Sequence, residues 1–188
     1  MVLQKVIDKV KDQGNFLTKE YLKAAMQLAK QKGSAELAYE LAVVLEGKDR
    51  RKMEIVVLAQ NDPEFSYKYA RDIPGADLKR HQNVIIRAQN AEYATEYAVD
   101  IPGANIKKLQ PIVLKSENPK LLYEFAYGAP DANIKLLEAE LIKTKNVEYI
   151  KKFEETVDDA NVRALRLARG RITKMAKRLP KEEIEKEM

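Results

Sequence analysis

The chain has no cysteine and no tryptophan, and only one histidine, His81, among its 188 residues. Disulfide bonds and thiol chemistry are therefore excluded, and cytoplasmic residence is the default expectation. Apolar residues never run long enough to span a membrane. The first fourteen residues alternate charged and apolar positions, so they lack the long apolar run of a secretory signal.

Residue patterns that carry catalysis or bind metals are also missing. No cluster of metal-ligating residues accompanies His81, and no glycine-rich loop of the phosphate-binding type is present. The adjacent carboxylates Glu154–Glu155 and Asp158–Asp159 lie in or beside an expected turn between helices, where acids cap and solubilise. We therefore expect no enzymatic activity, no cofactor and no metal. His81 falls in a column of apolar residues, which favours a buried imidazole over a functional one.

A pattern of 28 residues organises the chain, and the stretch from Asp62 to Asn90 shows it best. Asp62, Pro63 and Glu64 form a helix start, with a capping acceptor, a proline in the first turn and an acid near the positive helix end. Apolar residues then recur at helical spacing until Pro74 and Gly75. Asp77 caps a second helix, and Asn90 caps the next unit. Each unit is thus predicted to be two short antiparallel helices.

Capping residues and core residues recur at this spacing through five units. The predicted caps of the first helices are Ser34, Asp62, Asn90, Asn118 and Asn146, and those of the second helices are Asp49, Asp77, Asn105, Asn133 and Asn161. The main core columns are Leu37, Phe65, Tyr93, Leu121 and Tyr149, and Leu41, Tyr69, Tyr97, Phe125 and Phe153. A fixed period of this length is typical of a solenoid, in which neighbouring helix pairs bury each other's apolar faces.

The sequence therefore predicts an all-α fold, a right-handed α-solenoid of about six antiparallel helix pairs in a single domain. Residues 1–33 are expected to form an N-terminal capping pair with Thr18 as a cap, residues 34–161 the 28-residue repeats, and residues 162–188 a basic C-terminal helix with an acidic tail. Pro111 falls inside a predicted helix, where we expect a kink or a late helix start.

The units resemble tandem two-helix repeats, and stretches such as PEFSYKYARDIPGAD are similar to repeats of phage and bacterial proteins, most of unassigned function. The architecture is HEAT-like or TPR-like, but the TPR signature residues are absent. The resemblance covers roughly residues 35–161 and implies a fold without implying an activity. If it extends to a phage origin, it implies residence in the host cytoplasm and a role as a modulator or inhibitor of another protein.

The formal net charge of +5 is concentrated near the C-terminus. Residues 162–180 contain seven Lys or Arg and no acid, and residues 1–161 sum to zero. The basic helix offers Arg163, Arg166, Arg169, Arg171 and Lys174 as candidate anion-binding residues. Contact with nucleic acid, contact with an acidic partner or membrane surface, and a solvated end cap are all compatible with it.

A column of cations stands two residues after each cap of the second helices. Its members are Arg51, Lys79, Lys107, Lys135 and Arg163. Cations are unfavourable there because a helix N-terminus already carries positive partial charge. The column is therefore a candidate ladder of anion sites for RNA or DNA. The alternative is that each cation pairs with a glutamate of a neighbouring helix.

A column of aromatic residues lies on the other side of the first helices from their core stripe. It consists of Tyr39, Tyr67, Thr95 and Tyr123, with Arg71 and Tyr127 one turn further on. Tyr and Arg are frequent anchors in protein interfaces, which makes Tyr39, Tyr67, Arg71, Tyr123 and Tyr127 candidate protein-binding residues. The alternative is that they pack against the adjacent repeat.

These observations favour a non-enzymatic binding scaffold that engages a protein partner through a repeat surface. The alternative function is an RNA- or DNA-binding α-solenoid that uses the cation column and the basic C-terminal helix. The two differ in their expected response to salt, because binding to phosphates weakens steeply as salt is added.

Overall fold

In a computed structural model, residues 2–13 and 16–176 are described, and they form α-helices without a single strand. This confirms the all-α class and the helix-pair repeats. The helices are α1 (Val2–Gln13), α2 (Lys19–Lys32), α3 (Ala35–Val44), α4 (Gly47–Gln60), α5 (Pro63–Asp72), α6 (Leu78–Ala88), α7 (Ala91–Asp100), α8 (Ile106–Lys115), α9 (Pro119–Gly128), α10 (Ile134–Lys143), α11 (Val147–Thr156) and α12 (Val162–Ala176).

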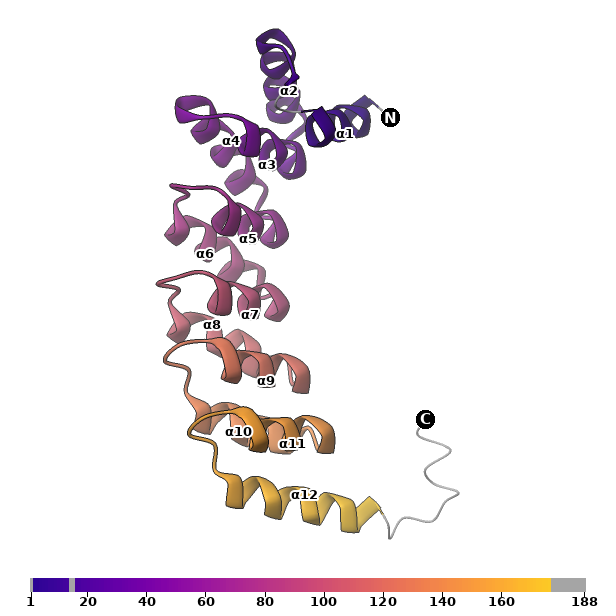
Figure 1. Cartoon of the computed structure of the whole chain (residues 1–188), viewed down its shortest axis with the longest axis vertical. Helices are drawn as coiled ribbons and strands as arrows, with labels where there is room; N and C mark the ends of the chain where they lie inside the picture. Colours follow the sequence, from indigo (N-terminus) through magenta and orange to yellow (C-terminus); the bar gives the residue numbers. More distant parts are fainter. Residues whose placement is uncertain (1, 14–15, 177–188) are drawn as a thin grey trace. The chain divides into compact units, whose positions relative to one another are not determined.

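The helices divide into two compact units, Met1–Asn105 and Ile106–Met188. Unit 1 contains the N-terminal pair α1 and α2, the pairs α3–α4 and α5–α6, and α7. Unit 2 contains α8 and the pairs α9–α10 and α11–α12 (Figure 1). We call α3, α5, α7, α9 and α11 the first helices, and α4, α6, α8, α10 and α12 the second helices.

The caps predicted for the first helices are all present. Each of these side chains accepts a hydrogen bond from a peptide N–H in the first turn: Ser34, Asp62, Asn90, Asn118 and Asn146. Asp77, Asn133 and Asn161 cap second helices in the same way, and Thr18 caps α2. Local capping chemistry therefore determines where most of the helices start.

Two predicted helix starts differ from the structure. Asp49 is not a cap, because α4 begins two residues earlier at Gly47, and Glu46 occupies the cap position without a side-chain bond. The Nε–H of Arg50 donates to the carbonyls of Ala42 and Leu45, which joins the start of α4 to the end of α3. Of the two alternatives predicted at Pro111, a kink or a late start, the late start is wrong: α8 begins at Ile106 and continues through the proline.

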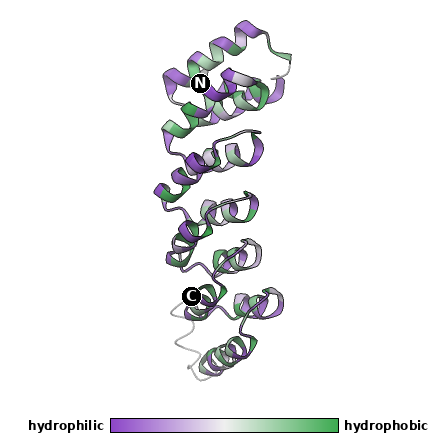
Figure 2. Ribbon diagram, turned by 90° about the vertical axis from the view of Figure 1, so that its left-hand side faces the viewer, coloured by the Kyte–Doolittle hydropathy of each residue, from purple (hydrophilic) through white to green (hydrophobic). Residues whose placement is uncertain are grey.

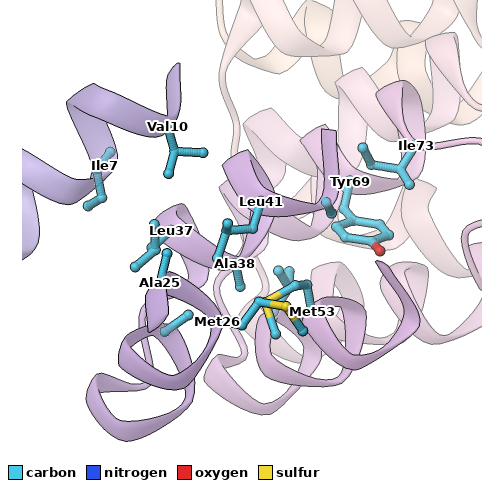
Figure 3. Packing of buried hydrophobic residues seen from close by; sticks show 13 residues of the cluster. Ile7, Val10, Ala25, Met26, Leu37, Ala38, Leu41, Met53, Tyr69 and Ile73 are labelled. Atoms are coloured by element: carbon cyan, nitrogen blue, oxygen red, sulfur yellow. The ribbon is translucent and has the colours of Figure 1, made fainter. Parts of the chain in front are cut away.

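Large apolar side chains on the predicted columns fill the core of each unit. In unit 1, Leu37, Leu41 and Met53 are fully buried, and Tyr69 lies beside them (Figure 3). Hydrophobic and hydrophilic residues alternate along the helices, as Figure 2 shows. The hydroxyls of Tyr69 and Tyr97 donate to the carbonyls of Arg50 and Leu78 at 3.1 and 2.6 Å. The equivalent positions in unit 2 are Phe125 and Phe153, which are buried without this bond.

A second set of bonds runs from α4, α6, α8 and α10 to the residue that precedes the next second helix. In Gln82, the side-chain carbonyl accepts the peptide N–H of Asn105, and the side-chain amide donates to the Asn105 carbonyl, both at 3.1 Å. Gln110 makes the same pair of bonds to Asn133, at 2.9 and 3.1 Å. Each partner lies 23 residues further along the chain, at the cap position of the next second helix. We call this contact the backbone clamp.

Glutamate replaces glutamine at the two ends of the same column. Glu54 accepts the peptide N–H of Asp77, and Glu138 accepts that of Asn161, both at 2.7 Å. A carboxylate keeps the acceptor for the peptide N–H but has no donor for the carbonyl. Gln82, Gln110 and Glu138 are buried polar side chains, so the clamp satisfies peptide groups in places that water does not reach freely.

We expect Gln82→Ala to lower the free energy of unfolding by about 2 kcal/mol, because it removes two hydrogen bonds and leaves the peptide groups of Asn105 unpaired. Gln82→Glu should cost less, since it keeps the acceptor, as Glu54 and Glu138 do naturally. Urea denaturation measures both. Gln27→Ala, at an exposed position of α2, is the control and should change stability by no more than about 0.5 kcal/mol. Equal midpoints for Gln82→Ala and Gln27→Ala would contradict the clamp.

Candidate functional site

The tyrosines of the aromatic column bind the following first helix through their hydroxyl groups. Tyr39 donates to the Asp72 carboxylate at 2.7 Å, and Tyr67 donates to the Asp100 carboxylate. In unit 2 the hydroxyls of Tyr123 and Thr156 lie 3.1 Å apart. Each partner stands 33 residues further along the chain, at the end of the next first helix. These contacts form a ladder between successive first helices.

Thr95 interrupts the pattern of residues that builds this ladder. Its side chain is buried, and its hydroxyl donates to the Ala91 carbonyl within the same helix, at 2.8 Å. The residue 33 positions further on is Gly128, which has no side chain to accept a bond. The tyrosine and its acceptor are therefore absent together from the same step of the repeat.

Arg71 strengthens the ladder in unit 1. Its guanidinium donates to both carboxylate oxygens of Asp72, at 2.7 and 3.0 Å, and to the Tyr67 hydroxyl at 3.2 Å. It also lies over the Tyr67 ring, 5.0 Å from the ring centroid. The bonds from Arg71 hold the pKa of Asp72 below its ordinary value. Burial, together with the bond to Asp100, raises the pKa of Tyr67 to about 12.

These contacts favour packing over partner binding for part of the aromatic column. Tyr67 is only 5% exposed, so it does not project as the exposed anchor that the sequence suggests. Tyr39 and Tyr123 are partly buried, and their hydroxyls are already bonded. Tyr127 differs, because it is 65% exposed and stacks on Tyr123 with 5.9 Å between ring centroids. Of the five protein-binding candidates, Tyr127 offers the most accessible aromatic ring.

The cation column, unlike the tyrosines, is not used in contacts between the repeats in the part of the chain that the structure describes. All five of its members are exposed, and none of them forms an ion pair within the described residues: Arg51, Lys79, Lys107, Lys135 and Arg163. The alternative explanation, pairing with glutamates of neighbouring helices, is therefore not what the structure shows. Lys79, Lys107, Lys135 and Arg163 are each the second residue of their helix, close to its positive end, whereas Arg51 is the fifth residue of α4.

The charge of unit 1 is divided between its first and second helices. The second helices α4 and α6 carry seven Lys or Arg and two acids. The first helices α3, α5 and α7 carry the reverse, two Lys or Arg and seven acids. Counting charge along the chain hides this separation, because the two sets cancel. The sequence suggests that the basic character is confined to the C-terminal helix. The structure shows that the second helices of unit 1 are basic as well.

Unit 2 has the same bias in its second helices. Helices α8, α10 and α12 carry ten Lys or Arg and two acids, whereas α9 and α11 carry three and four. Two arginines of α12 are not free, because Arg166 and Arg169 bind the carboxylate of Glu154 at 2.6 and 3.2 Å. Arg163, Arg171 and Lys174 are exposed and have no such partner among the described residues. The basic C-terminal helix and acidic tail are predicted over residues 162–188, and the part after Ala176 lies outside the described residues.

A groove between α4 and α6 lies on the basic side of unit 1. It has a volume of about 650 Å³, and its lining includes Ile55, Ile86, Arg80, Asn83 and Arg87. Ile55 is 58% exposed, so the lining includes an accessible apolar side chain as well as the two arginines. Among the described residues, Arg80 and Arg87 have no ion pair, so the groove adds two cations to the face that carries Lys79.

His81 is a core residue, as its column predicts. Its side chain is fully buried and stacks on Tyr69, with ring centroids 4.9 Å apart. Its Nε2 lies 3.3 Å from a carboxylate oxygen of Glu54, the residue that clamps Asp77. Burial lowers the pKa of His81, and Glu54 opposes that shift only in part.

Comparison with family models, curated proteins and solved structures finds no match. The resemblance to phage and bacterial repeats therefore stays a prediction. In the part of the chain that the structure describes, no group of three or more acidic, histidine or cysteine side chains is placed to hold a metal ion. None of the helices described is long and apolar enough to cross a membrane.

Tyr67→Phe should lower the free energy of unfolding by about 2 kcal/mol, because it removes a hydrogen bond to a charged acceptor and retains the ring. Tyr127→Phe is the matched control, since the Tyr127 hydroxyl makes no hydrogen bond within the described residues. Thermal and urea unfolding of both variants measure the difference. If both variants unfold alike, the ladder contributes nothing to stability.

His81 should make the fold less stable in mild acid. Its folded-state pKa is depressed, so below about pH 6.5 the unfolded chain takes up a proton that the folded chain refuses. Stability should then fall as the pH is lowered from 7 towards about 5.5, above the range where most carboxylates titrate. His81→Leu, which places the residue of the equivalent positions 109 and 137, should flatten this slope. An unchanged slope in His81→Leu would show that another group causes it.

Proposed function

We propose that this protein is a non-enzymatic scaffold that binds nucleic acid through the faces of its second helices. One observation supports this most directly. The cations of these helices are exposed and mostly without acidic partners, while the acids of unit 1 gather on the first helices. Such a face attracts a polyanion, and phosphate contacts by Lys and Arg release condensed counterions.

The positions of the lysines favour a ligand over a structural role. A cation in the first turn of a helix costs about 0.3–1 kcal/mol at low salt, and the fold gives Lys79, Lys107 and Lys135 no compensating ion pair. The arginines that do have a structural role look different: Arg50 caps α3, and Arg166 is bound to Glu154. A bound phosphate would supply the missing acceptor and would also gain from the helix N-terminus.

A protein partner is the second candidate. The exposed ring of Tyr127 favours it, because aromatic residues are frequent interface anchors. The other tyrosines support it less, since their hydroxyls are used between repeats. A phage or bacterial modulator of another protein would fit this second function.

Two triple variants of unit 2 distinguish binding by the cations of the second helices from a general effect of net charge. Lys107→Gln, Lys108→Gln and Lys135→Gln remove three exposed cations from the second helices. Lys120→Gln, Lys151→Gln and Lys152→Gln remove three exposed lysines from the first helices, with the same change in net charge. We expect the first variant alone to lose affinity for nucleic acid, measured by fluorescence anisotropy at about 50 mM salt. Its slope of log affinity against log salt should flatten by about 2.7 for a duplex.

The first variant should also fold at least as stably as the parent, because three cations leave positive helix ends. Equal loss of affinity in both variants would mean that net charge alone controls binding. Absence of binding of the parent to single-stranded and double-stranded DNA and RNA at this salt would reject the function. Capture of a protein that survives nuclease treatment and is lost in Tyr127→Ala would then favour the second candidate.

A further inference from the structure

We infer that the ligand of the second-helix face is the phosphate backbone of a double-stranded nucleic acid, bound without recognition of its bases. This inference rests on the proposed function and specifies it. Three features of the second helices support it. They lack aromatic residues, their central exposed positions hold few hydrogen-bonding side chains, and their cations lie at two levels along the helix.

Aromatic residues are absent from the second helices. The sequences of α4, α6, α8, α10 and the described α12 contain no Phe, Tyr or Trp, whereas every first helix except α3 contains at least two aromatic residues. Proteins that bind single strands stack bases on aromatic side chains, which contribute much of the affinity for each base. A single strand on this face would have its phosphates neutralised and its bases left without a stacking surface.

The exposed positions between the cations of the second helices offer few groups that could read base edges. The column between the cations consists of Ile55, Asn83, Pro111, Ala139 and Leu167. Of these, only the side chain of Asn83 can donate or accept hydrogen bonds, and recognition of bases in a groove needs such groups at several positions. The face is therefore built for backbone contacts, which position a protein on a duplex without reading its sequence.

The second helices of each unit carry cations at two levels along the helix. We call the cations that follow a helix start the near row (Lys79 and Arg80 in unit 1, Lys107 and Lys108 in unit 2) and those further along the helix the far row (Arg87 in unit 1, Lys115 and Arg171 in unit 2). Lys108 and Lys115 stand seven residues apart, as do Arg80 and Arg87, so members of a pair share one side of their helix. At about 1.5 Å per residue, the rows are about 10 Å apart along the helix.

This separation suits a duplex better than a single strand. The major groove of B-form DNA is about 12 Å wide, and phosphates line both of its edges. Long lysine and arginine side chains on two rows can therefore reach phosphates of both strands. A single strand offers one line of phosphates, which engages one row and leaves the other unpaired. The apolar and small residues between the rows then face the groove without specific contacts.

The test compares ligands of equal length with the full chain: a 20-base-pair DNA duplex, the matching RNA duplex, each single strand, and heparin as a polyanion without bases. We expect both duplexes, or the DNA duplex alone, to bind at least about tenfold more tightly than any single strand at about 100 mM salt. Duplexes of different sequence should bind alike. Each phosphate contact should contribute about 0.9 to the salt slope on a duplex and about 0.7 on a single strand.

Two row variants of unit 2 sharpen the test. The near-row variant is Lys107→Gln with Lys108→Gln, and the far-row variant is Lys115→Gln with Arg171→Gln. Each should flatten the salt slope on a duplex by about 1.8, because each removes two phosphate contacts. The control is Lys120→Gln with Lys151→Gln on the first helices, which should leave the slope unchanged.

Several results would overturn the inference while leaving nucleic-acid binding intact. These are single strands that bind as tightly as duplexes, a preference for one base composition, or a far-row variant that binds duplexes like the parent. Heparin that binds as tightly as a duplex at equal charge would show that the spacing of the rows is not used. Failure of the parent to bind any of the nucleic acids would instead reject the proposed function itself.

Discussion

The backbone clamp is the contact on which the stacking of the second helices depends. A helix start exposes peptide groups that its own helix cannot satisfy, and stacking removes water from them. Gln82 and Gln110 satisfy both the N–H and the carbonyl of the residue that precedes the next second helix, Asn105 and Asn133. Because the clamp is buried and directional, it constrains the residue before the following helix in a way that apolar packing alone does not.

The clamp and the tyrosine ladder together shape the two surfaces. On the first helices of unit 1, the ladder uses carboxylates, with Asp72 and Asp100 as acceptors for Tyr39 and Tyr67. On the second helices the clamp is internal, so nothing in the stacking requires acids outside. The second-helix face can therefore carry cations without disturbing either set of contacts. The separation of charge between the two sets of helices is therefore compatible with the same contacts that hold the repeats together.

Much of the fold could be predicted because its signals are local. Capping residues such as Asp62 act within three residues, and core residues such as Tyr69 recur at helical spacing. The clamp cannot be predicted in this way, although Glu54, Gln82, Gln110 and Glu138 stand in register as a polar column. Its partners are peptide groups 23 residues away, which carry no side-chain signature. Tyr67 was likewise placed on a surface because its acceptor, Asp100, belongs to the next repeat. Asp49 predicts the wrong start for α4, because aspartate is favoured in the first turn of a helix as well as at the cap.

The offset between partners has a consequence for how such a chain can change length. Tyr39 binds Asp72 in the next repeat, and Glu54 clamps Asp77 in that same repeat. In-frame loss of residues 62–89 would bring Asp100 to the place of Asp72 and the peptide N–H of Asn105 to the place of that of Asp77. Both inter-repeat contacts would find an equivalent partner. Unequal recombination in steps of 28 codons thus preserves the contacts between repeats. It also changes the number of second-helix lysines and arginines that the protein presents.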